Sequence, residues 1–392
     1  MHKLNFIGEE EKRAVTRVMD SGLLSGFVAS ASDSFYGGPE VQAFEKEFAE
    51  YIGCKHAVSV NSWSSGILIA LGAMNLKPGD EVIVSSWNMC STVTSILQWL
   101  CIPVFCDIDP ATFSLDIDKL ESCISNKTRV IIVNDMHGLG ADTNVVLEIA
   151  KKHNLQVFSD SAQSIGNVST LADIGGYSFN WHKHIHCGEG GICVTNDDML
   201  AQKMQLLRNH AEGVVESFDI SLANMIGFNF RMTEIQAAIM REQLKKLPVV
   251  IQKRKQIAKQ LADVFSKYSF IKLPDLENNV FCDFVMEFEN QFQRNHCATQ
   301  LSNYGIDCCT KFSRGPVHLL PVFQQKQAYG NSKLPWSLND CNYDYSEGIL
   351  PVTEMLTKTF LNISVEEDYD TQDIDNIEMV LNQINTIGSA TC

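Results

Sequence analysis

Apolar and polar positions along the chain follow two different periods. Between about residues 40 and 200, stretches with apolar residues at helical spacing alternate with short apolar runs rich in β-branched residues. The helical stretches are residues 39–53, 65–76 and 144–154, and the short runs are residues 81–87, 103–109, 129–135, 155–160, 175–180 and 190–197. Continuous apolar runs are typical of strands that are buried on both faces. The alternation predicts an α/β fold with a central, mostly parallel sheet covered by helices on both faces.

The pattern changes after residue 230. Residues 231–268 form one long amphipathic stretch, in which Pro248 predicts a bend. Beyond about residue 270, short apolar runs such as residues 280–288 mix with helical segments. We therefore expect a large domain over residues 1–245, followed by a connector helix and a smaller C-terminal α/β domain over residues 246–392.

Charge and composition narrow the classes of function. The chain has 392 residues and a net charge of -16, which would repel nucleic-acid phosphates, so we expect no nucleic-acid partner. No run of 18 apolar residues exists, and no membrane span is expected. The 13 cysteines form no C-x-x-C pair, and the first residues contain no apolar signal-peptide core. Both features favour a cytoplasmic protein with reduced thiols.

Several polar residues follow the predicted strands. Ligands of open α/β sheets bind outside the carboxyl ends of the strands, where we expect Asp160, Gln163 and Lys183 to lie. Ser62 and Ser64 precede a predicted helix. Singly, each has a plainer interpretation, as a turn residue, a helix cap or a solvated charge. Together they match the needs of pyridoxal 5'-phosphate (PLP): an amine for a Schiff base, a carboxylate for the pyridine nitrogen, and a helix N-terminus with hydroxyls for the phosphate.

Lys183 lies between two histidines, and a third histidine follows two residues after the second. His182, His184 and His186 would share one face of an extended segment, and Cys187 follows them, so a zinc site is conceivable. The lysine is explained by PLP, which does not need the histidines. We predict no metal site and expect the histidines to line the substrate pocket or its floor.

Several blocks of sequence, in their order, resemble the DegT/DnrJ/EryC1/StrS sugar aminotransferases, a branch of the fold-type I PLP-dependent enzymes. The blocks are residues 37–66, 77–84, 103–116, 159–166, 177–191, 206–213 and 227–239, and the resemblance runs from about residue 37 to 365. It implies a large domain with a mostly parallel seven-stranded sheet, a smaller C-terminal domain, and a homodimer with shared active sites.

The resemblance also implies roles for residues around the cofactor ring. Lys183 precedes a Gly-Glu-Gly-Gly turn at the family's spacing, and it would form the Schiff base and then act as general base and acid. Asp160 takes the place of the pyridinium partner, and Gln163 would hydrogen-bond the ring hydroxyl. Trp87 takes the place of the aromatic residue that stacks on the ring.

Other matching positions concern the phosphate. Ser178 fills the family's phosphate-binding serine, and Ser62, Trp63 and Ser64 replace its Ser-Gly-Thr loop. Trp63 is a departure from the pattern, because it replaces a small glycine. Asn229 resembles the asparagine that reaches the phosphate of the neighbouring subunit.

Substrate-side positions follow the family pattern less closely. Arg231 is expected to bind a carboxylate, and His318 and His184 are expected on the substrate side. Residues 135–138 replace the more usual His-Leu-Tyr-Gly, so a substrate-side tyrosine is missing. Residues 27–36 look like an insertion. These departures would alter substrate specificity rather than remove PLP.

The activity implied by the resemblance is transfer of an amino group from an amino acid, glutamate by default, to a keto sugar. The sugar would be nucleotide-linked, the pathway would make surface polysaccharide or deoxyamino sugars, and the kinetics would be ping-pong. One alternative is a PLP-dependent sugar dehydratase, in which a histidine replaces the lysine. Another is a non-catalytic homologue, which would have lost Asp160 or Lys183. Both residues are present, which favours transamination.

Overall fold

Helices and strands alternate in the computed structural model, which describes residues 7–167, 172–217, 224, 226–273, 275–312, 315–365 and 369–388. The strands are β1 His56–Val60, β2 Glu81–Ser85, β3 Ile102–Cys106, β4 Thr128–Asn134, β5 Gln156–Asp160, β6 Ile174–Ser178, β7 Gly191–Thr195, β8 Ile271–Lys272, β9 Asp283–Phe288, β10 Cys308–Cys309 and β11 Phe360–Ser364. The α-helices are α1 Glu9–Ser21, α2 Pro39–Ile52, α3 Trp63–Ala73, α4 Cys90–Gln98, α5 Ile117–Leu120, α6 Thr143–His153, α7 Asp198–Arg208, α8 Glu234–Phe265, α9 Gln291–Asn303, α10 Pro321–Gln324, α11 Pro351–Thr359 and α12 Thr371–Gly388. Short 3-10 helices are η1 Asp33–Tyr36, η2 Glu121–Cys123, η3 Ala211–Gly213, η4 Val215–Ser217, η5 Val317–Leu319 and η6 Trp336–Leu338.

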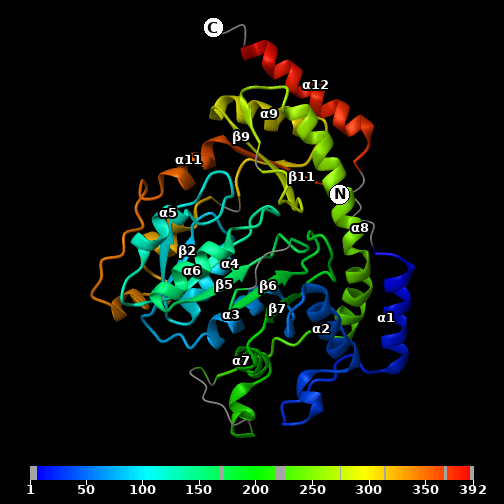
Figure 1. Ribbon diagram of the computed structural model, residues 1–392, viewed down its shortest axis with the longest axis vertical. Helices are drawn as coiled ribbons and strands as arrows, with labels where there is room; N and C mark the ends of the chain where they lie inside the picture. Colours follow the sequence, from blue (N-terminus) through cyan, green and yellow to red (C-terminus); the bar gives the residue numbers. More distant parts are fainter. Residues whose placement is uncertain are drawn as a thin grey trace.

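Seven strands form the central sheet in the order β1-β7-β6-β5-β4-β2-β3 (Figure 1). The pairs from β6 through β5, β4 and β2 to β3 are parallel, and β7 runs antiparallel to both of its neighbours. This arrangement confirms the mostly parallel, seven-stranded sheet that the family resemblance implied.

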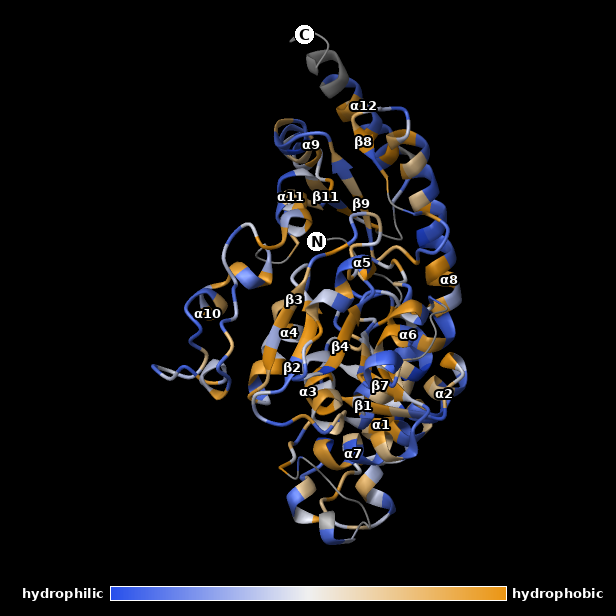
Figure 2. Ribbon diagram, turned by 60° about the vertical axis from the view of Figure 1, so that its left-hand side comes forward, coloured by the Kyte–Doolittle hydropathy of each residue, from blue (hydrophilic) through white to orange (hydrophobic). Residues whose placement is uncertain are grey.

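Helices cover both faces of this sheet, as the continuous apolar strands predicted. Val130 and Ile132 of β4 belong to a core with α3, α4 and α7, whereas Ile131 and Val133 face α6. Beside that second core, α2 and α8 pack against β1, β6 and β7. Strands β2, β3 and β4 are correspondingly hydrophobic along their length (Figure 2).

A second sheet, β10-β11-β9-β8, lies at the upper end of the molecule in Figure 1, with α9 packed against it. Helix α12 packs against α9 and α8. All of its strand pairs are antiparallel. Its core includes Phe284, Leu301 and Leu361, together with Ile257 and Leu261 from the end of α8.

Helix α8 connects the two sheets as one continuous element of 32 residues (Figure 1). Pro248 lies inside it and does not end it. The boundary expected between residues 245 and 246 therefore falls within this helix. The C-terminal part also returns to the first core, because Phe323, Trp336 and Tyr345 pack against the large sheet.

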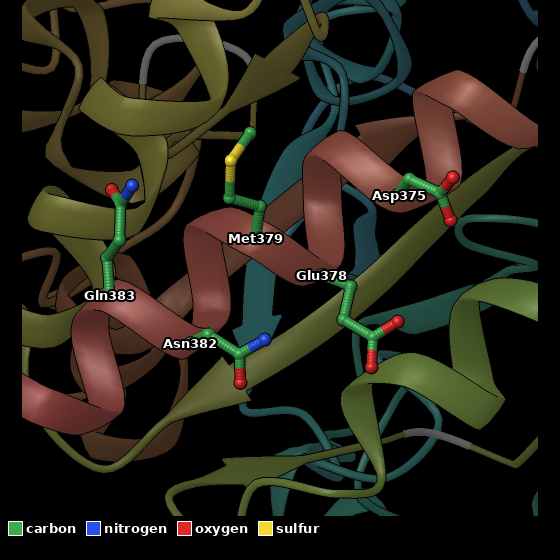
Figure 3. Close-up of a pocket in the computed structure, with 5 residues that line it drawn as sticks. All are labelled: Asp375, Glu378, Met379, Asn382 and Gln383. Carbon is green, nitrogen blue, oxygen red and sulfur yellow. The ribbon is translucent and has the colours of Figure 1, made fainter.

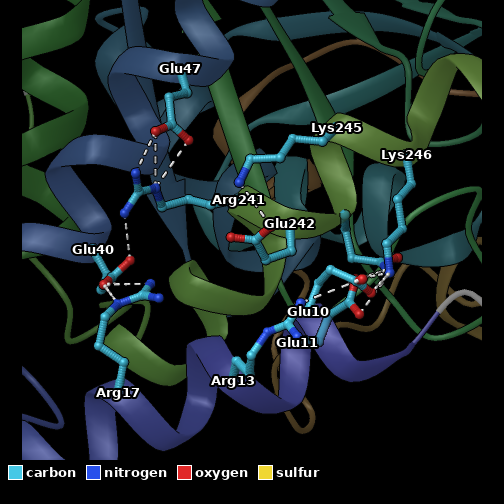
Figure 4. Close-up of polar contacts among 11 residues, drawn as sticks. Glu10, Glu11, Arg13, Arg17, Glu40, Glu47, Arg241, Glu242, Lys245 and Lys246 are labelled. Carbon is cyan, nitrogen blue, oxygen red and sulfur yellow. Dashed lines mark hydrogen bonds and ion pairs between the residues drawn. The ribbon is translucent and has the colours of Figure 1, made fainter.

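Ion pairs fasten α1 and α2 to α8 (Figure 4). Arg241 of α8 contacts Glu47 at 2.6 Å and Glu40 at 2.7 Å, both on α2. Arg17 of α1 contacts the other oxygen of Glu40 at 2.9 Å. None of the helices in the described ranges is both long and apolar enough to cross a membrane.

Candidate active site

A cavity of about 290 Å³ lies at the carboxyl ends of β4, β5 and β6, beside the N-termini of α3 and α4. Eight of the residues singled out from the sequence line it: Ser62, Trp63, Ser64, Asp160, Gln163, Ser178, His182 and Lys183. Parallel strands bring their carboxyl ends to one edge of a sheet, so residues far apart in the chain converge there.

Lys183 lies in the turn that follows β6, and its backbone N–H donates to the carbonyl of Asn180 at 2.9 Å. Its side chain is only 7% exposed, although it borders the cavity. An amine held in this way faces the cavity while the surrounding protein limits access by water. This environment suits an amine that must react with a carbonyl group.

Asp160 ends β5 at the floor of the cavity and is buried. Its Oδ1 accepts a hydrogen bond from Trp63 Nε1 at 2.7 Å, and its Oδ2 accepts one from Thr92 Oγ1 at 2.7 Å. Longer contacts of 3.3 Å come from the backbone N–H of Ala162 and the amide of Asn134. Burial raises the pKa of Asp160, and the hydrogen bonds from Thr92 and Trp63 oppose that effect by stabilising the anion.

Gln163 is oriented by the main chain. The backbone N–H of His137 donates to Gln163 Oε1 at 2.8 Å. The Nε2 group of the amide remains as a donor for an oxygen in the cavity, which is the role that the sequence predicts.

The N-terminus of α3 forms one side of the cavity. Ser62 caps this helix, since its Oγ accepts from the backbone N–H of Ser65 at 3.2 Å, so the plainer cap interpretation holds for that hydroxyl. Ser64, in the first turn, is exposed and lines the cavity, as does Ser178 at the end of β6. Backbone N–H groups and the helix dipole make this position suitable for an anion.

Trp87 does not reach the cavity, contrary to the sequence expectation. Its ring is buried between the two sheets, stacked on Phe312 at 5.9 Å and edge-on to Phe360 at 4.9 Å. Its Nε1 donates to His137 at 3.2 Å. The chain turns after β2, and Met89, which is 51% exposed, lines the cavity instead. A thioether can also contact an aromatic ring.

Residues 181–185, where the first two of the alternating histidines lie, form turns and bends rather than an extended segment. Among the three alternating histidines, His182 lines the cavity. His184 is buried, and its Nε2 hydrogen-bonds the carbonyl of Val280 at 2.9 Å. The expectation that the histidines line the pocket or its floor is therefore wrong for His184, because the turns direct it and His182 to different surroundings. Within the part of the chain that the structure describes, no three His, Cys, Asp or Glu side chains form a potential metal site.

Two further expected substrate residues lie away from this cavity. His318 is buried between Ser86 Oγ at 2.7 Å and Glu354 at 3.2 Å. Arg231 donates through Nε and Nη2 to Asn209 Oδ1, at 2.9 and 2.6 Å. In the single chain, His318 therefore joins Ser86 to Glu354, and Arg231 binds the side chain of Asn209.

Asn229 also lies outside the cavity of its own chain. It is exposed and forms an isolated bridge with Asn209. A role in a neighbouring subunit is compatible with this exposure and stays a prediction.

Sequence reasoning missed Thr92 and Asn134, which both contact Asp160. Asn134 is the last residue of β4, and Thr92 lies in the first turn of the helix after β2. Asn134 could have been predicted because it ends a parallel strand beside β5, whereas Thr92 lies in a helix seven residues beyond the end of β2.

Another hollow, of about 500 Å³, lies along α12 and is lined by Asp375, Glu378, Met379, Asn382 and Gln383 (Figure 3). All five side chains come from one helix. Glu378 pairs with Lys267, and Asn382 accepts a hydrogen bond from Tyr268 at 2.9 Å, so these polar groups are used in packing α12 against the end of α8.

Comparison with known proteins identifies the relatives of this chain. The sequence model of the DegT/DnrJ/EryC1/StrS aminotransferase family matches residues 6–379. The chain belongs to this family. Its membership confirms the resemblance inferred from the ordered sequence blocks.

Individual known proteins are similar to this chain over most of their length. The spore coat polysaccharide biosynthesis protein SpsC of Bacillus subtilis (strain 168) is 30% identical over 86% of this chain and 89% of its own. A GDP-perosamine synthase of Caulobacter vibrioides is 33% identical over 73% of this chain and 79% of its own. The solved structure of NtdA from Bacillus subtilis, with bound cofactor PMP, has a TM-score of 0.80 and 25% identity, covering 96% of this chain and 81% of that one.

Proposed function

We propose that this protein is a PLP-dependent aminotransferase that moves an amino group from glutamate to a nucleotide-linked keto sugar. The pathway that it serves makes surface polysaccharide or deoxyamino sugars. One observation carries the proposal: the amine of Lys183 and the carboxyl of Asp160 border one cavity that begins at a helix N-terminus.

The residues present fit PLP. Lys183 would hold the cofactor through its amine, Asp160 would bind the ring nitrogen, and Gln163 would donate to the ring hydroxyl. Ser64, Ser178 and the N-terminal N–H groups of α3 would hold the phosphate. When bound, PLP supplies an electron sink that stabilises negative charge at the carbon being deprotonated.

The protein contributes proton transfer and shielding. Lys183 Nζ would accept the proton from Cα of the amino donor as general base and would return it as general acid. Burial of the Lys183 stem and of Asp160 limits water near these atoms. One cavity serves both half-reactions, so ping-pong kinetics are expected.

The substrate class is supported by the relatives. One similar protein is named a GDP-perosamine synthase and another a spore coat polysaccharide biosynthesis protein. An experiment with several substrates would identify the nucleotide and the sugar ring carbon. The pyridoxamine form of the enzyme is offered keto sugars linked to GDP, UDP or dTDP, together with the unlinked sugars, and turnover is compared. Turnover of the unlinked sugars alone would contradict the nucleotide-linked part of the proposal.

The proposal includes a homodimer in which Asn229 reaches the phosphate bound by the partner subunit. Its exposed position outside its own cavity supports this assignment.

The proposal also includes a cytoplasmic location, since the twelve cysteines in the described residues are free thiols.

Replacement of the reactive amine tests the function directly. Lys183→Ala should abolish the visible absorbance band of the PLP-loaded protein and lower the transamination rate by several orders of magnitude, because no other amine borders the cavity among the described residues. The matched control is Lys245→Ala, which removes an exposed lysine that pairs with Glu242. Retained turnover in Lys183→Ala would refute the assignment.

A further inference from the structure

The indole of Trp63 is built into the floor of the cavity. Its side chain is 7% exposed and borders the cavity at the start of α3. Three glycines leave the space that it needs. A Cβ on Gly176 of β6 would lie 2.1 Å from Trp63 Cη2, one on Gly66 would lie 2.7 Å from Cε3, and one on Gly191 would lie 2.8 Å from the Trp63 Cα. The surrounding backbone therefore fixes where this ring lies.

The fixed ring directs its single donor at one oxygen of Asp160. Trp63 Nε1 lies 2.7 Å from Oδ1, while Thr92 Oγ1 lies 2.7 Å from Oδ2. These two short hydrogen bonds bind the two oxygens of Asp160 from different side chains and so fix the plane of its carboxyl group. Indole N–H can only donate, so this contact favours the ionised form of Asp160.

The ionisation of Asp160 decides where the proton between its carboxyl and the ring nitrogen of the cofactor would lie. When a buried carboxyl binds a pyridine nitrogen, the proton can reside on the nitrogen, giving an ion pair, or on the carboxyl, giving a neutral pair. A low dielectric favours the neutral pair unless donors stabilise the carboxylate. A protonated ring nitrogen makes the better electron sink.

We propose that Trp63 is a positioning residue whose indole N–H keeps Asp160 ionised and oriented, so that the shared proton stays on the ring nitrogen of the cofactor. This inference rests on the proposed function, and it assigns a role to the bulky residue that replaces the small glycine of the family pattern. Thr92 acts in the same direction on the second oxygen.

The direct test is Trp63→Phe, which keeps a flat ring in the glycine-lined space and removes the donor. The protein is loaded with PLP labelled with ¹⁵N in the ring, and the ring-nitrogen chemical shift is recorded. We expect a shift toward the value of unprotonated pyridine, corresponding to a change of roughly tenfold to a hundredfold in the proton-sharing equilibrium, the usual effect of one hydrogen bond to a charged group. The PLP dissociation constant should rise in parallel.

Trp336→Phe is the matched control. Its indole is also buried in the core of the large sheet and donates to Tyr345 Oη at 2.9 Å, without bordering the cavity. It should leave the ring-nitrogen signal unchanged. Thr92→Val should move the signal in the same direction as Trp63→Phe, and Thr92→Ser should restore it.

A measurement on the unmodified chain covers the case in which Trp63→Phe does not fold. In the ¹⁵N-labelled protein, the Trp63 indole N–H should exchange slowly with solvent deuterium and should shift when PLP binds, whereas that of Trp181, which is 58% exposed, should exchange quickly. Fast exchange at Trp63, or an unchanged ring-nitrogen signal in Trp63→Phe, overturns the inference while PLP binding still supports the proposed function. Absence of PLP binding to the unmodified protein overturns both.

Discussion

At the residue scale, burial and hydrogen-bond partners separate side chains that look equivalent in the sequence. Lys183 and His184 are adjacent, and both are buried. Lys183 borders the cavity, whereas His184 turns toward the carbonyl of Val280. Trp63 and Trp87 were both expected at the cofactor, but only Trp63 borders the cavity, where it contacts Asp160. Trp87 fills the space between the two sheets.

The buried state of His184 predicts a pH dependence of stability. Burial, with the nearby charge of Arg254, lowers the pKa of His184 to about 3. A histidine with a pKa of about 6.5 in the unfolded chain therefore takes up a proton on unfolding, so its contribution to stability is complete above pH 6.5 and is lost as the pH falls toward 3. Between pH 7 and 5 this group should lower the free energy of unfolding by about 2 kcal/mol.

Urea unfolding curves at several pH values would measure this contribution. His184→Gln keeps an N–H donor for the Val280 carbonyl and removes the titrating group, so its stability should fall less steeply between pH 7 and 5. Equal slopes for the two proteins would mean that His184 is protonated to the same extent in both states.

At the element scale, caps and inter-helix contacts decide where elements begin and how they are joined. Ser62 caps α3 and so orients its N-terminal N–H groups at the cavity. Thr233 caps α8 with the reciprocal bonds of a capping box, and that helix then continues through Pro248. Packing against two cores stabilises α8 on both sides of the proline, which outweighs the lost backbone bond.

The Arg241 contacts should be worth more than those of an ordinary surface pair. The guanidinium meets both oxygens of Glu47 and also contacts Glu40, which holds the pKa of Arg241 above its usual value. Arg241→Met should lower the free energy of unfolding by about 1–2 kcal/mol, by loss of a partly buried, bidentate pair.

Thermal or urea unfolding at low and high salt would check this value, and the difference between the two proteins should shrink in high salt. Lys245→Met is the control one turn away, because its pair with Glu242 is exposed and should be worth less than about 0.5 kcal/mol. Equal losses in the two variants would contradict a special role for Arg241.

At the scale of the whole molecule, one helix and one returning segment tie the two sheets together. Helix α8 contributes to the cores of both, and Phe323, Trp336 and Tyr345 lie against the large sheet although they come late in the chain. Phe312, which precedes that segment, borders the cavity. The site therefore depends on how both parts of the chain pack.

The proposed shared site predicts complementation between inactive variants. In a two-fold dimer, a mixed pair of Lys183→Ala and Asn229→Ala subunits contains one site with both native residues and one with neither. Mixing equal amounts under subunit exchange should restore wild-type cofactor retention in about a quarter of the sites.

Cofactor absorbance after gel filtration would measure that recovery, with each variant alone as the control. Mixing without recovery, under conditions where exchange is demonstrated, would show that Asn229 does not act across subunits. A monomer that retains PLP would contradict the shared site altogether.

The sequence by itself determined the layered α/β fold, the family and the central members of the site. Apolar periodicity depends on local burial, and the spacing of Lys183 from its glycine turn is a property of the chain alone. Asp160 and Gln163 were predictable for the same reason, since strand ends converge at one edge of a parallel sheet.

Only the tertiary structure decided which neighbours share the cavity. It excluded Trp87, His184, His318 and Arg231, included Thr92, and gave Trp63 a partner 97 residues away. Such contacts depend on the direction of each side chain after a turn and on the room left by glycines in other strands. The spacing of residues along the chain gives neither the direction of a side chain nor the room around it, because both arise when separate segments pack together.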